Sequence, residues 1–293
     1  MKKKMVLVIC ALGTLAIGAG QLSCNRDKVA SIEMINQCVD FHRRKMFPQA
    51  VRDCSKAITL DPESADAHHS LGMIYIETKE YEQAARHLQK AVAFREDNAL
   101  YHYQLGEVYE WMNQPEQAAK EYERAVALDP ALYKAHYRLG LVSREAEPEK
   151  AMQKFTDAIN RNPRFADAYR DLGLIYSEWG LYSQAEQVFR EGIKALAGQE
   201  DAVAIMHHLL GTVLSDKKEY AQAIQEFKTA LELKPGMDDA MFSLGWTYSF
   251  TNVENAKIWL SKFLQSTTGK TRPDYVTAAQ TKLYELQFGL NRK

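Results

Sequence analysis

The amino-acid sequence predicts an all-α protein: a right-handed α-solenoid of about seven helix pairs, followed by a C-terminal capping helix. Two patterns predict it, a Leu-Gly dipeptide that recurs at nearly constant spacing and an alanine that follows each dipeptide at a second constant spacing. The composition agrees, because 46% hydrophobic and 26% charged residues are typical of a packed chain rather than a disordered one. With only 15 glycines and 8 prolines in 293 residues, a loop-rich β protein is disfavoured.

The Leu-Gly dipeptide marks the first helix of each pair. A glycine costs about 1 kcal/mol relative to alanine inside a helix, so we expect each glycine where two helices touch backbone to backbone, with the alanine opposite. Cys38 takes the place of the glycine in the first unit. The dipeptides are Leu71-Gly72, Leu105-Gly106, Leu139-Gly140, Leu172-Gly173, Leu210-Gly211 and Leu244-Gly245.

The alanine marks the second helix, and apolar residues follow it in steps of four and three, which is one face of a helix. Prolines close four of the units because proline cannot continue a helix. The unit with four extra residues gains them around residues 194–199, where Gly198 would end a lengthened helix. The alanines are Ala50, Ala84, Ala118, Ala151, Ala185, Ala223 and Ala256. The predicted units are 31–64, 65–98, 99–132, 133–165, 166–203, 204–237 and 238–271.

The segment after the last unit is predicted to be the capping helix, within residues 272–293. Tyr275, Ala279, Leu283 and Leu286 recur there at helical spacing over Pro273–Phe288. The last repeat of a solenoid exposes an apolar face unless another element covers it.

This pattern resembles the tetratricopeptide repeat (TPR), in which the Leu-Gly pair, a tyrosine three residues later, the alanine, a Phe-type residue and the closing proline hold fixed places. Ser143 and Leu214 depart from the tyrosine position. The resemblance implies that the first helices line a concave groove that binds a segment of another protein, without catalysis.

Aromatic and arginine side chains dominate interface energetics, so they are the expected groove contacts. The alternative is that several of them only pack within the repeats. Some TPR domains clamp a terminal carboxylate; Lys134 and Arg138 fit two places of that clamp, but His69, Met73 and Gln104 depart from it. The expected contacts are Tyr103, Tyr137, Arg138, Leu141, Arg144, Arg170, Leu174, Phe242 and Trp246.

Residues 1–23 have the pattern of an export signal, with three lysines before an apolar run and small residues after it. Leu22-Ser23-Cys24 resembles a bacterial lipoprotein signal, which implies a lipid on Cys24 and a linker over residues 24–30. Asn25 favours the outer membrane, with the protein facing the periplasm. The alternatives are cleavage near Gly20, giving a soluble periplasmic protein, and anchoring in the inner membrane, including by a short transmembrane segment.

Cys38 and Cys54 lie on the two helices of the first unit, and an oxidising compartment would allow a disulfide between them. The alternative is a pair of buried thiols, since a bridge needs the two Cα atoms within about 7 Å. Four histidines share one repeat position and would lie too far apart to bind one metal ion: His68, His102, His136 and His207. We therefore expect no metal and no cofactor.

The expected function is that of an exported, lipid-anchored scaffold that binds an envelope protein and assists assembly of an envelope complex. By resemblance to bacterial TPR lipoproteins, that complex would be a machine such as the secretin of a type IV pilus. The sequence lacks the phosphate-loop, zinc-protease and nucleophile-elbow motifs, so no enzyme is expected, and a net charge of −1 disfavours nucleic acid. The alternatives are an adaptor that acts through self-association or its convex face and, less favoured, an enzyme or small-ligand protein with a site in the groove.

Overall fold

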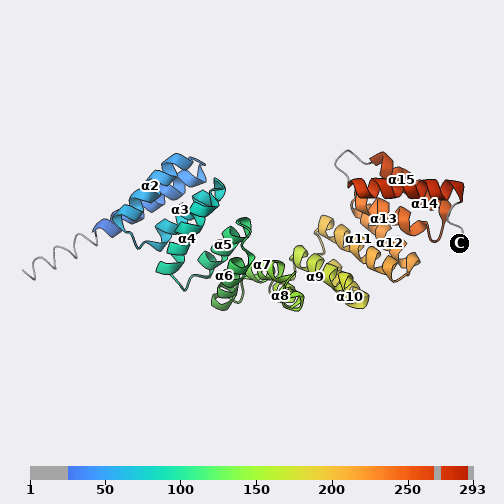
Figure 1. Ribbon diagram of the computed structural model, residues 1–293, viewed down its shortest axis with the longest axis horizontal. Helices are drawn as coiled ribbons and strands as arrows, with labels where there is room; N and C mark the ends of the chain where they lie inside the picture. Colours follow the sequence, from blue (N-terminus) through green and yellow to red (C-terminus); the bar gives the residue numbers. More distant parts are fainter. Residues whose placement is uncertain (1–25, 267–271, 290–293) are drawn as a thin grey trace, which may run out of the picture. The chain divides into compact units, whose positions relative to one another are not determined.

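The computed structural model describes residues 26–266 and 272–289 (Figure 1). These residues form helices and turns with no β-strand, which confirms the predicted all-α solenoid. None of the described helices is long and apolar enough to cross a membrane. The predicted signal over residues 1–23 and Cys24 lie outside the described residues, as does Gly20.

The chain divides after Val142 into two compact units, each built from antiparallel helices that pack on their neighbours in sequence. Unit 1 is helical over residues 26–43, and we name this segment the first helix. It continues with α2 (Phe47–Leu60), α3 (Ala65–Glu77), α4 (Tyr81–Phe94), α5 (Ala99–Trp111), α6 (Pro115–Leu128) and α7 (Tyr133–Ser143), whose last residue is the first of unit 2.

Unit 2 continues the same helix-pair pattern and ends with one additional helix (Figure 1). That last helix, α15, covers the segment for which the sequence spacing predicts a cap. The elements are α8 (Pro148–Arg161), α9 (Ala166–Glu178), α10 (Tyr182–Ala195), α11 (Glu200–Asp216), α12 (Tyr220–Leu233), α13 (Asp238–Tyr248), α14 (Val253–Ser266) and α15 (Pro273–Phe288).

The four extra residues of the fifth unit lengthen a different helix from the one expected. α10 keeps 14 residues, the length of α4, α6 and α12, whereas α11 has 17 residues against 13 in α3, α5 and α9. Gly198 has a φ of 85° and lies in the turn between them. The additional turn therefore belongs to the start of α11, where Glu200 and Asp201 suit the positive end of a helix dipole.

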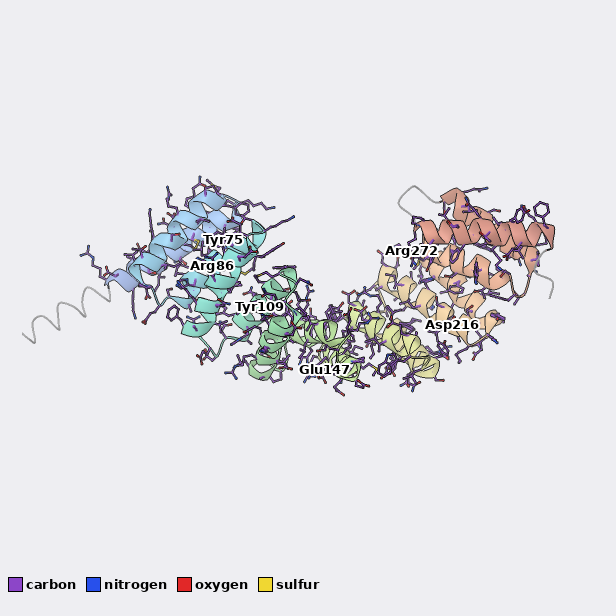
Figure 2. The ribbon with its side chains drawn as sticks, in the orientation of Figure 1. Tyr75, Arg86, Tyr109, Glu147, Asp216 and Arg272 are labelled. Atoms are coloured by element: carbon purple, nitrogen blue, oxygen red, sulfur yellow. A yellow bond between two sulfur atoms is a disulfide. The ribbon has the colours of Figure 1, made fainter. Side chains whose placement is uncertain are left out.

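One turn geometry joins the two helices of most pairs. One residue of the turn adopts a left-handed conformation, and the next N–H donates to a carbonyl five residues earlier, which is the Schellman arrangement. Tyr75 and Tyr109, both labelled in Figure 2, supply two of these carbonyls, to Glu80 N (2.8 Å) and Gln114 N (2.9 Å). The left-handed residues are Lys45, Lys79, Asn113, Gly180 and Lys218.

The repeated glycines make room for a large side chain rather than for the alanine expected opposite them. A methyl group added at Gly106 would lie 2.6 Å from the ring of Tyr122, and one added at Gly173 would lie 2.3 Å from the ring of Phe189. Both rings are fully buried. A backbone atom of the second helix is among the three nearest atoms at Gly72, where the Ala84 carbonyl oxygen would lie 3.4 Å away, and at Gly245, where Leu260 N would lie 2.9 Å away. The expected backbone-to-backbone contact is therefore, in most pairs, a contact between backbone and an inserted side chain.

Candidate functional site

We name the first helices of the pairs the inner helices, and their groove-lining positions the inner face. The inner helices of unit 1, α3, α5 and α7, carry a chain of polar contacts that begins at Asp66 in α3. Arg95 donates to both oxygens of Asp66, at 2.9 and 3.0 Å, and the Tyr101 hydroxyl donates to the same carboxylate. Burial alone would raise the pKa of Asp66, but the hydrogen bonds from Tyr101 and Arg95 outweigh it and hold that pKa below its ordinary value. Asp66 is therefore an ionised anchor that ties α3 to the start of α5.

His69 extends this contact chain along the same face. Its ring stacks on Tyr101 at 4.5 Å between centroids, and its Nε2 lies 2.6 Å from Gln104 Oε1. Burial lowers the pKa of His69, so the ring is neutral near pH 7 and donates Nε2–H to the glutamine. His69 and Gln104 stand at two positions of the carboxylate clamp that other TPR domains carry, and here these two side chains bond to each other.

Glu107 and Glu110 of α5 share one arginine. Arg138 of α7 lies 3.6 Å from Glu107 and 3.7 Å from Glu110. The Tyr103 hydroxyl donates to Glu107 at 2.9 Å, and the Tyr122 hydroxyl donates to Glu110. Burial raises the pKa of Glu107, against the opposing effects of Tyr103 and Arg138. We name these five residues the Glu-Arg cluster.

Tyr103 belongs to the core as much as to the inner face. It is only 8% exposed, and its ring packs against Tyr122 at 5.8 Å. Arg138, Tyr137 and Leu141 of α7 are half-buried, whereas Leu100 at the start of α5 is 47% exposed. Leu100 lies three and seven residues before Tyr103 and Glu107, so it shares their helix face. Together with Leu100, the predicted residues of α5 and α7 therefore form a mixed surface in which Leu100 is the most exposed apolar group.

The predicted arginines of unit 2 have acidic partners. Arg144 lies 2.6 Å from Glu178, and Arg170 lies 2.6 Å from Asp167 and 2.9 Å from Asp171. Leu174, one turn after Arg170 on α9, is half-buried. These pairs are partly exposed, so each adds little to folding stability, and the guanidinium groups are held in place at the surface.

Phe242 and Trp246 contact the capping helix. The ring of Tyr275 in α15 stacks on Phe242 at 4.3 Å, and Lys282 Nζ lies 4.9 Å from the centre of the Trp246 ring. Phe242 also packs on the buried Phe263 at 5.4 Å. Both predicted contacts are half-buried. The end of the inner face in unit 2 is thus partly occupied by the protein's own last helix.

The histidines that share one repeat position link neighbouring segments. His68 and His102 each donate Nε2–H to a carbonyl oxygen six residues earlier, at 3.2 and 3.1 Å, and each places Nδ1 beside a second partner. That partner is His87 for His68 (3.0 Å), Glu121 for His102 (2.7 Å) and Glu226 for His207 (2.6 Å). Among the described residues, no three His, Cys, Asp or Glu side chains are grouped to hold a metal ion.

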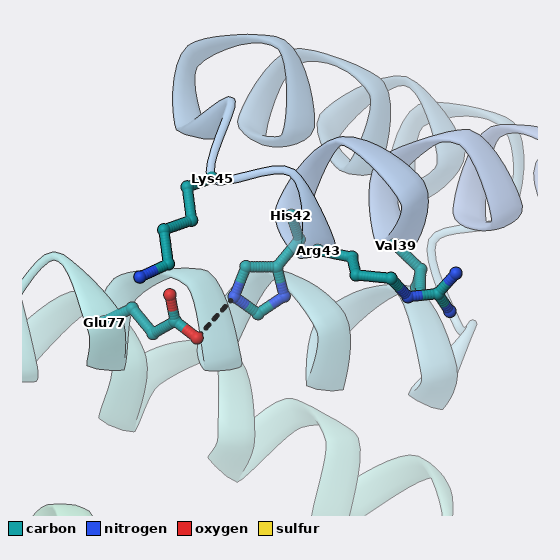
Figure 3. Close-up of a pocket in the computed structure, with 5 residues that line it drawn as sticks. All are labelled: Val39, His42, Arg43, Lys45 and Glu77. Atoms are coloured by element: carbon teal, nitrogen blue, oxygen red, sulfur yellow. Dashed lines mark ion pairs between the residues drawn. The ribbon is translucent and has the colours of Figure 1, made fainter.

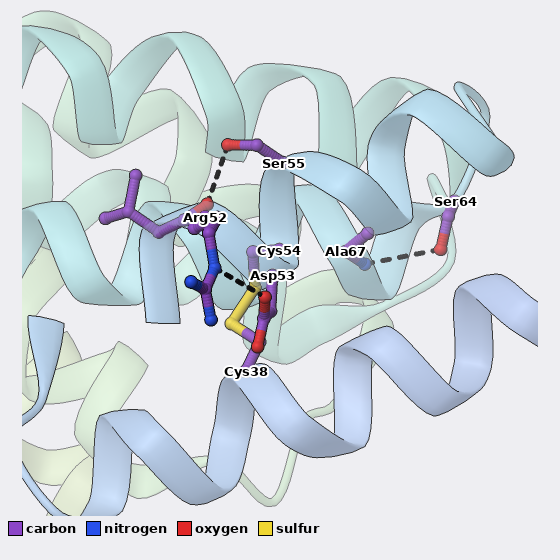
Figure 4. Close-up of a disulfide and its surroundings, with 8 residues drawn as sticks. Cys38, Arg52, Asp53, Cys54, Ser55, Ser64 and Ala67 are labelled. Atoms are coloured by element: carbon purple, nitrogen blue, oxygen red, sulfur yellow. Dashed lines mark hydrogen bonds and ion pairs between the residues drawn. A yellow bond between two sulfur atoms is a disulfide. The ribbon is translucent and has the colours of Figure 1, made fainter. Parts of the chain in front are cut away.

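Cys38 of the first helix and Cys54 of α2 are joined by a disulfide, with their Cα atoms 5.3 Å apart (Figure 4). Both residues are fully buried in a small core with Ala50, Leu71 and Ile74. Figure 4 also shows Asp53, which is buried beside the bridge and accepts from Arg52 at 3.1 Å. The bridge joins the first helix to α2. Among the described residues, no earlier repeat packs against this pair.

Four family models for tetratricopeptide repeats match this chain. Their matches fall on residues 72–113 (TPR repeat) and on residues 99–132, 54–86 with 154–187, and 204–237 (tetratricopeptide repeat). The chain is a tetratricopeptide repeat protein. The matches lie in both units, and the one over 204–237 begins inside α11, after its additional first turn.

Solved TPR structures share the fold. The C-terminal part of a TPR protein from Cytophaga hutchinsonii has a TM-score of 0.68 at 13% identity, covering 83% of this chain and 98% of its own. PilF of Pseudomonas aeruginosa has a TM-score of 0.57 at 22% identity, with 73% and 96% covered. A MamA structure has a TM-score of 0.54 at 26% identity, with 57% and 91% covered. No curated protein sequence matches this TPR protein.

Sequence reasoning missed the residues that hold the inner face together. Tyr101 and Arg95 are not among the expected site residues, yet they position Asp66. One signal was present, because Tyr101 and Asp66 are 35 residues apart, one repeat plus one residue, and so lie on neighbouring first helices. Which rings turn inward depends on side-chain rotamers, which repeat spacing does not encode.

Proposed function

We propose that this TPR protein is an exported, lipid-anchored scaffold that binds a segment of another protein along its inner helices and assists assembly of a complex in the bacterial envelope. The observation that carries the binding proposal is the mixed surface of α5 and α7. Exposed Leu100 offers an apolar anchor, and Arg138, which is hydrogen-bonded to Tyr103 and held between two carboxylates, offers a partly exposed positive charge beside it.

The placement in the envelope is supported by the sequence before the first helix. Residues 1–23 have the three parts of an export signal, and Cys24 follows Leu22-Ser23 as in lipoproteins. Several acyl chains would hold the protein on a membrane, whereas one chain binds only marginally. The outer membrane, facing the periplasm, is the proposed site, and the partner is proposed to be an envelope protein. No catalytic role and no cofactor are proposed.

Site-specific photo-crosslinking in cells tests the binding surface. A crosslinker at Leu100 is compared with one at Ile258 on α14, a matched apolar position that is 50% exposed but lies on a second helix. The expected result is a crosslinked peptide from one envelope protein at position 100 and not at position 258. Equal crosslinking at both positions would contradict a specific inner-face partner.

A double variant sharpens the same test. Tyr137→Ala with Arg144→Ala is expected to reduce the crosslink from position 100 severalfold while circular dichroism shows unchanged helicity. Loss of helicity would assign these residues to the core instead. The anchor is tested separately by mass spectrometry of the mature N-terminus, where Cys24 is expected to carry acyl chains and Cys24→Ser is expected to carry none.

A second function, an adaptor that self-associates, is favoured by one observation. Tyr284 and Phe288 of α15 contact each other with their ring centroids 4.7 Å apart, and they are the most exposed aromatic side chains of the described residues, at 57% and 65%. Sedimentation velocity at several concentrations tests it. Association that disappears in Tyr284→Ser with Phe288→Ser would support self-association, and a monomer at all concentrations would exclude it.

A further inference from the structure

The first helix has two contrasting faces. On its packed side, the Ser31 hydroxyl donates to the Ala57 carbonyl at 2.9 Å and Cys38 is bridged to Cys54. On the opposite side, Val29, Ile32 and Val39 are 54%, 57% and 37% exposed. The spacings of three and seven residues place these three side chains on one helix face. We name them, together with the exposed Arg43 four residues further on, the first-helix stripe.

The residues at these positions vary from repeat to repeat: the Ile32 position is Leu100 in α5, and the Val39 position is Met73 in α3. One repeat later, the residues equivalent to Val29 and Ile32 are Glu63 and Asp66, and Asp66 is ionised and paired with Arg95. The repeat architecture therefore does not require valine and isoleucine there. Exposed β-branched residues at the end of the array indicate a surface on which the helix rests.

The charges around the stripe are balanced at its first end and more basic at its second end. Arg26 and Lys28 lie near its first residues, with Asp27 and Glu33 as the acids, and all four are exposed. At the other end, Val39, Arg43 and Lys45 line a hollow beside the His42–Glu77 pair, whose atoms are 3.2 Å apart (Figure 3). Arg44 there is paired with Asp40 at 2.9 Å. An apolar stripe with a basic end complements an anionic phospholipid surface.

The position of this helix in the chain fits the same surface. Cys24 precedes Arg26 by two residues, and two residues span at most about 7 Å. A lipid on Cys24 would therefore hold the first turns of the helix at the level of the lipid headgroups, where an apolar helix face is buried.

We infer that the first-helix stripe lies on an anionic phospholipid bilayer and that Val29 and Ile32 enter its headgroup region. The inference rests on the proposed lipid anchor for its location, while the stripe itself is a separate contact. The helix then orients the repeats on the membrane instead of leaving them on a flexible tether.

The first experiment measures depth in the bilayer. The acylated protein carries a polarity-sensitive fluorophore on Ile32→Cys, with Ile258→Cys as the matched control, in vesicles of phosphatidylethanolamine and phosphatidylglycerol. Under non-reducing conditions the bridge keeps Cys38 and Cys54 unreactive. At position 32 we expect a blue-shifted emission and severalfold protection from aqueous iodide. Emission and quenching equal to those at position 258 would overturn the inference.

The second experiment separates the stripe from the anchor. The mature chain from residue 24 onward, prepared without acylation, is titrated with the same vesicles. Val29→Ser with Ile32→Ser is expected to lower its partitioning about tenfold or more, whereas Ile258→Ser leaves it unchanged. Both altered residues are exposed in the folded protein, so the variant is expected to keep its helicity.

The outcomes distinguish the two proposals. If Cys24 carries no acyl chain but the chain binds vesicles through Val29 and Ile32, the anchor fails and the inference stands. If Cys24 is acylated and position 32 stays accessible to iodide, the inference fails and the anchor stands. A dimer that dissociates in the Val29→Ser, Ile32→Ser variant, without vesicle binding, would replace the bilayer by a second copy of this chain.

Discussion

Units 1 and 2 contain the same helix-pair repeat, but the first repeat of unit 1 and the last repeat of unit 2 are stabilised in different ways. Unit 1 begins with a helix joined to α2 by the Cys38–Cys54 bridge, and that helix keeps an exposed apolar stripe. Unit 2 ends with α15, which buries Ala279 against Leu260 and Phe263 and stacks Tyr275 on Phe242.

The difference shows two ways to stabilise a terminal repeat. A covalent bridge restricts the unfolded chain without covering any apolar surface, so the exposed stripe of the first helix stays available for contact. A capping helix stabilises the last repeat by burying apolar surface, and it occupies part of the inner face as it does so. The first end is therefore expected to respond to redox conditions and the second end to packing changes.

The largest effect is expected for a charge placed under the capping helix. Ala279 is fully buried, so Ala279→Arg should detach α15 and destabilise unit 2 by about 3–5 kcal/mol, because an unpaired charge is buried. Gln280→Arg, on the exposed side of the same helix, is the control and should change stability by less than about 0.5 kcal/mol. Urea unfolding measures both, and equal midpoints would show that α15 does not seal this end.

The next effect concerns the bridge of unit 1. Its two cysteines are 16 residues apart, and closing a loop of that size stabilises a fold by about 3 kcal/mol. Reductant should lower the melting temperature of the wild type and leave Cys38→Ser with Cys54→Ser unchanged. Thiol labelling of the unfolded wild type should increase after reduction. Unchanged labelling would mean that the protein carries free thiols.

A smaller loss of stability is expected when alanine replaces a repeated glycine, and it should differ between two equivalent glycines. Gly173→Ala in unit 2 forces a methyl group to within 2.3 Å of the Phe189 ring, a rigid neighbour, and should destabilise by about 1–3 kcal/mol. At Gly72 in unit 1 the nearest atom is Leu88 Cγ at 2.9 Å. That side chain can shift, and helix propensity returns about 1 kcal/mol, so Gly72→Ala should be close to neutral. Equal losses of stability would contradict this account of the glycines.

Repeat spacing predicted the helix pairs and the capping helix because periodicity reports which helix face is buried. The Leu-Gly and alanine positions locate α5 and α6, and the spacing of Tyr275, Ala279 and Leu283 locates α15. The additional turn was assigned to the wrong helix, since an insertion between two helices can extend either of them. Helix-terminal acids at Glu200 and Asp201 favoured α11, and that signal was local rather than periodic.

The site was less predictable than the fold. Repeat position indicated that Tyr103 and Phe242 lie near the inner face, but one is buried against Tyr122 and the other lies under Tyr275. Such contacts depend on rotamers and on which neighbour reaches a ring first. The Glu107–Arg138–Glu110 arrangement likewise joins two helices through side-chain geometry.

The smallest effect is expected at acid pH, on the stability of one helix pair in unit 1 compared with one helix pair in unit 2. In unit 1, His68 and His87 place their Nδ1 atoms 3.0 Å apart, whereas α9 and α10 of unit 2 carry Tyr169 and Val188 at the equivalent positions. Burial, then His68, Lys90 and Arg86, lower the pKa of His87 to about 4, and burial also lowers the pKa of His68. Only α3 and α4 should therefore lose stability through histidine protonation as the pH falls.

Proton linkage gives the direction in which folding stability changes with pH. The unfolded chain, with histidine pKa values near 6.5, binds protons that the folded pair refuses, so stability is complete above pH 6.5 and is lost as pH falls toward 4. Allowing for solvent screening, the loss between pH 7.5 and 5 should be about 1 kcal/mol. Hydrogen exchange should show faster opening of α3 and α4 than of α9 and α10 at pH 5. His87→Gln should remove most of that difference, and equal acid sensitivity of the two helix pairs would assign it to groups outside the histidine pair.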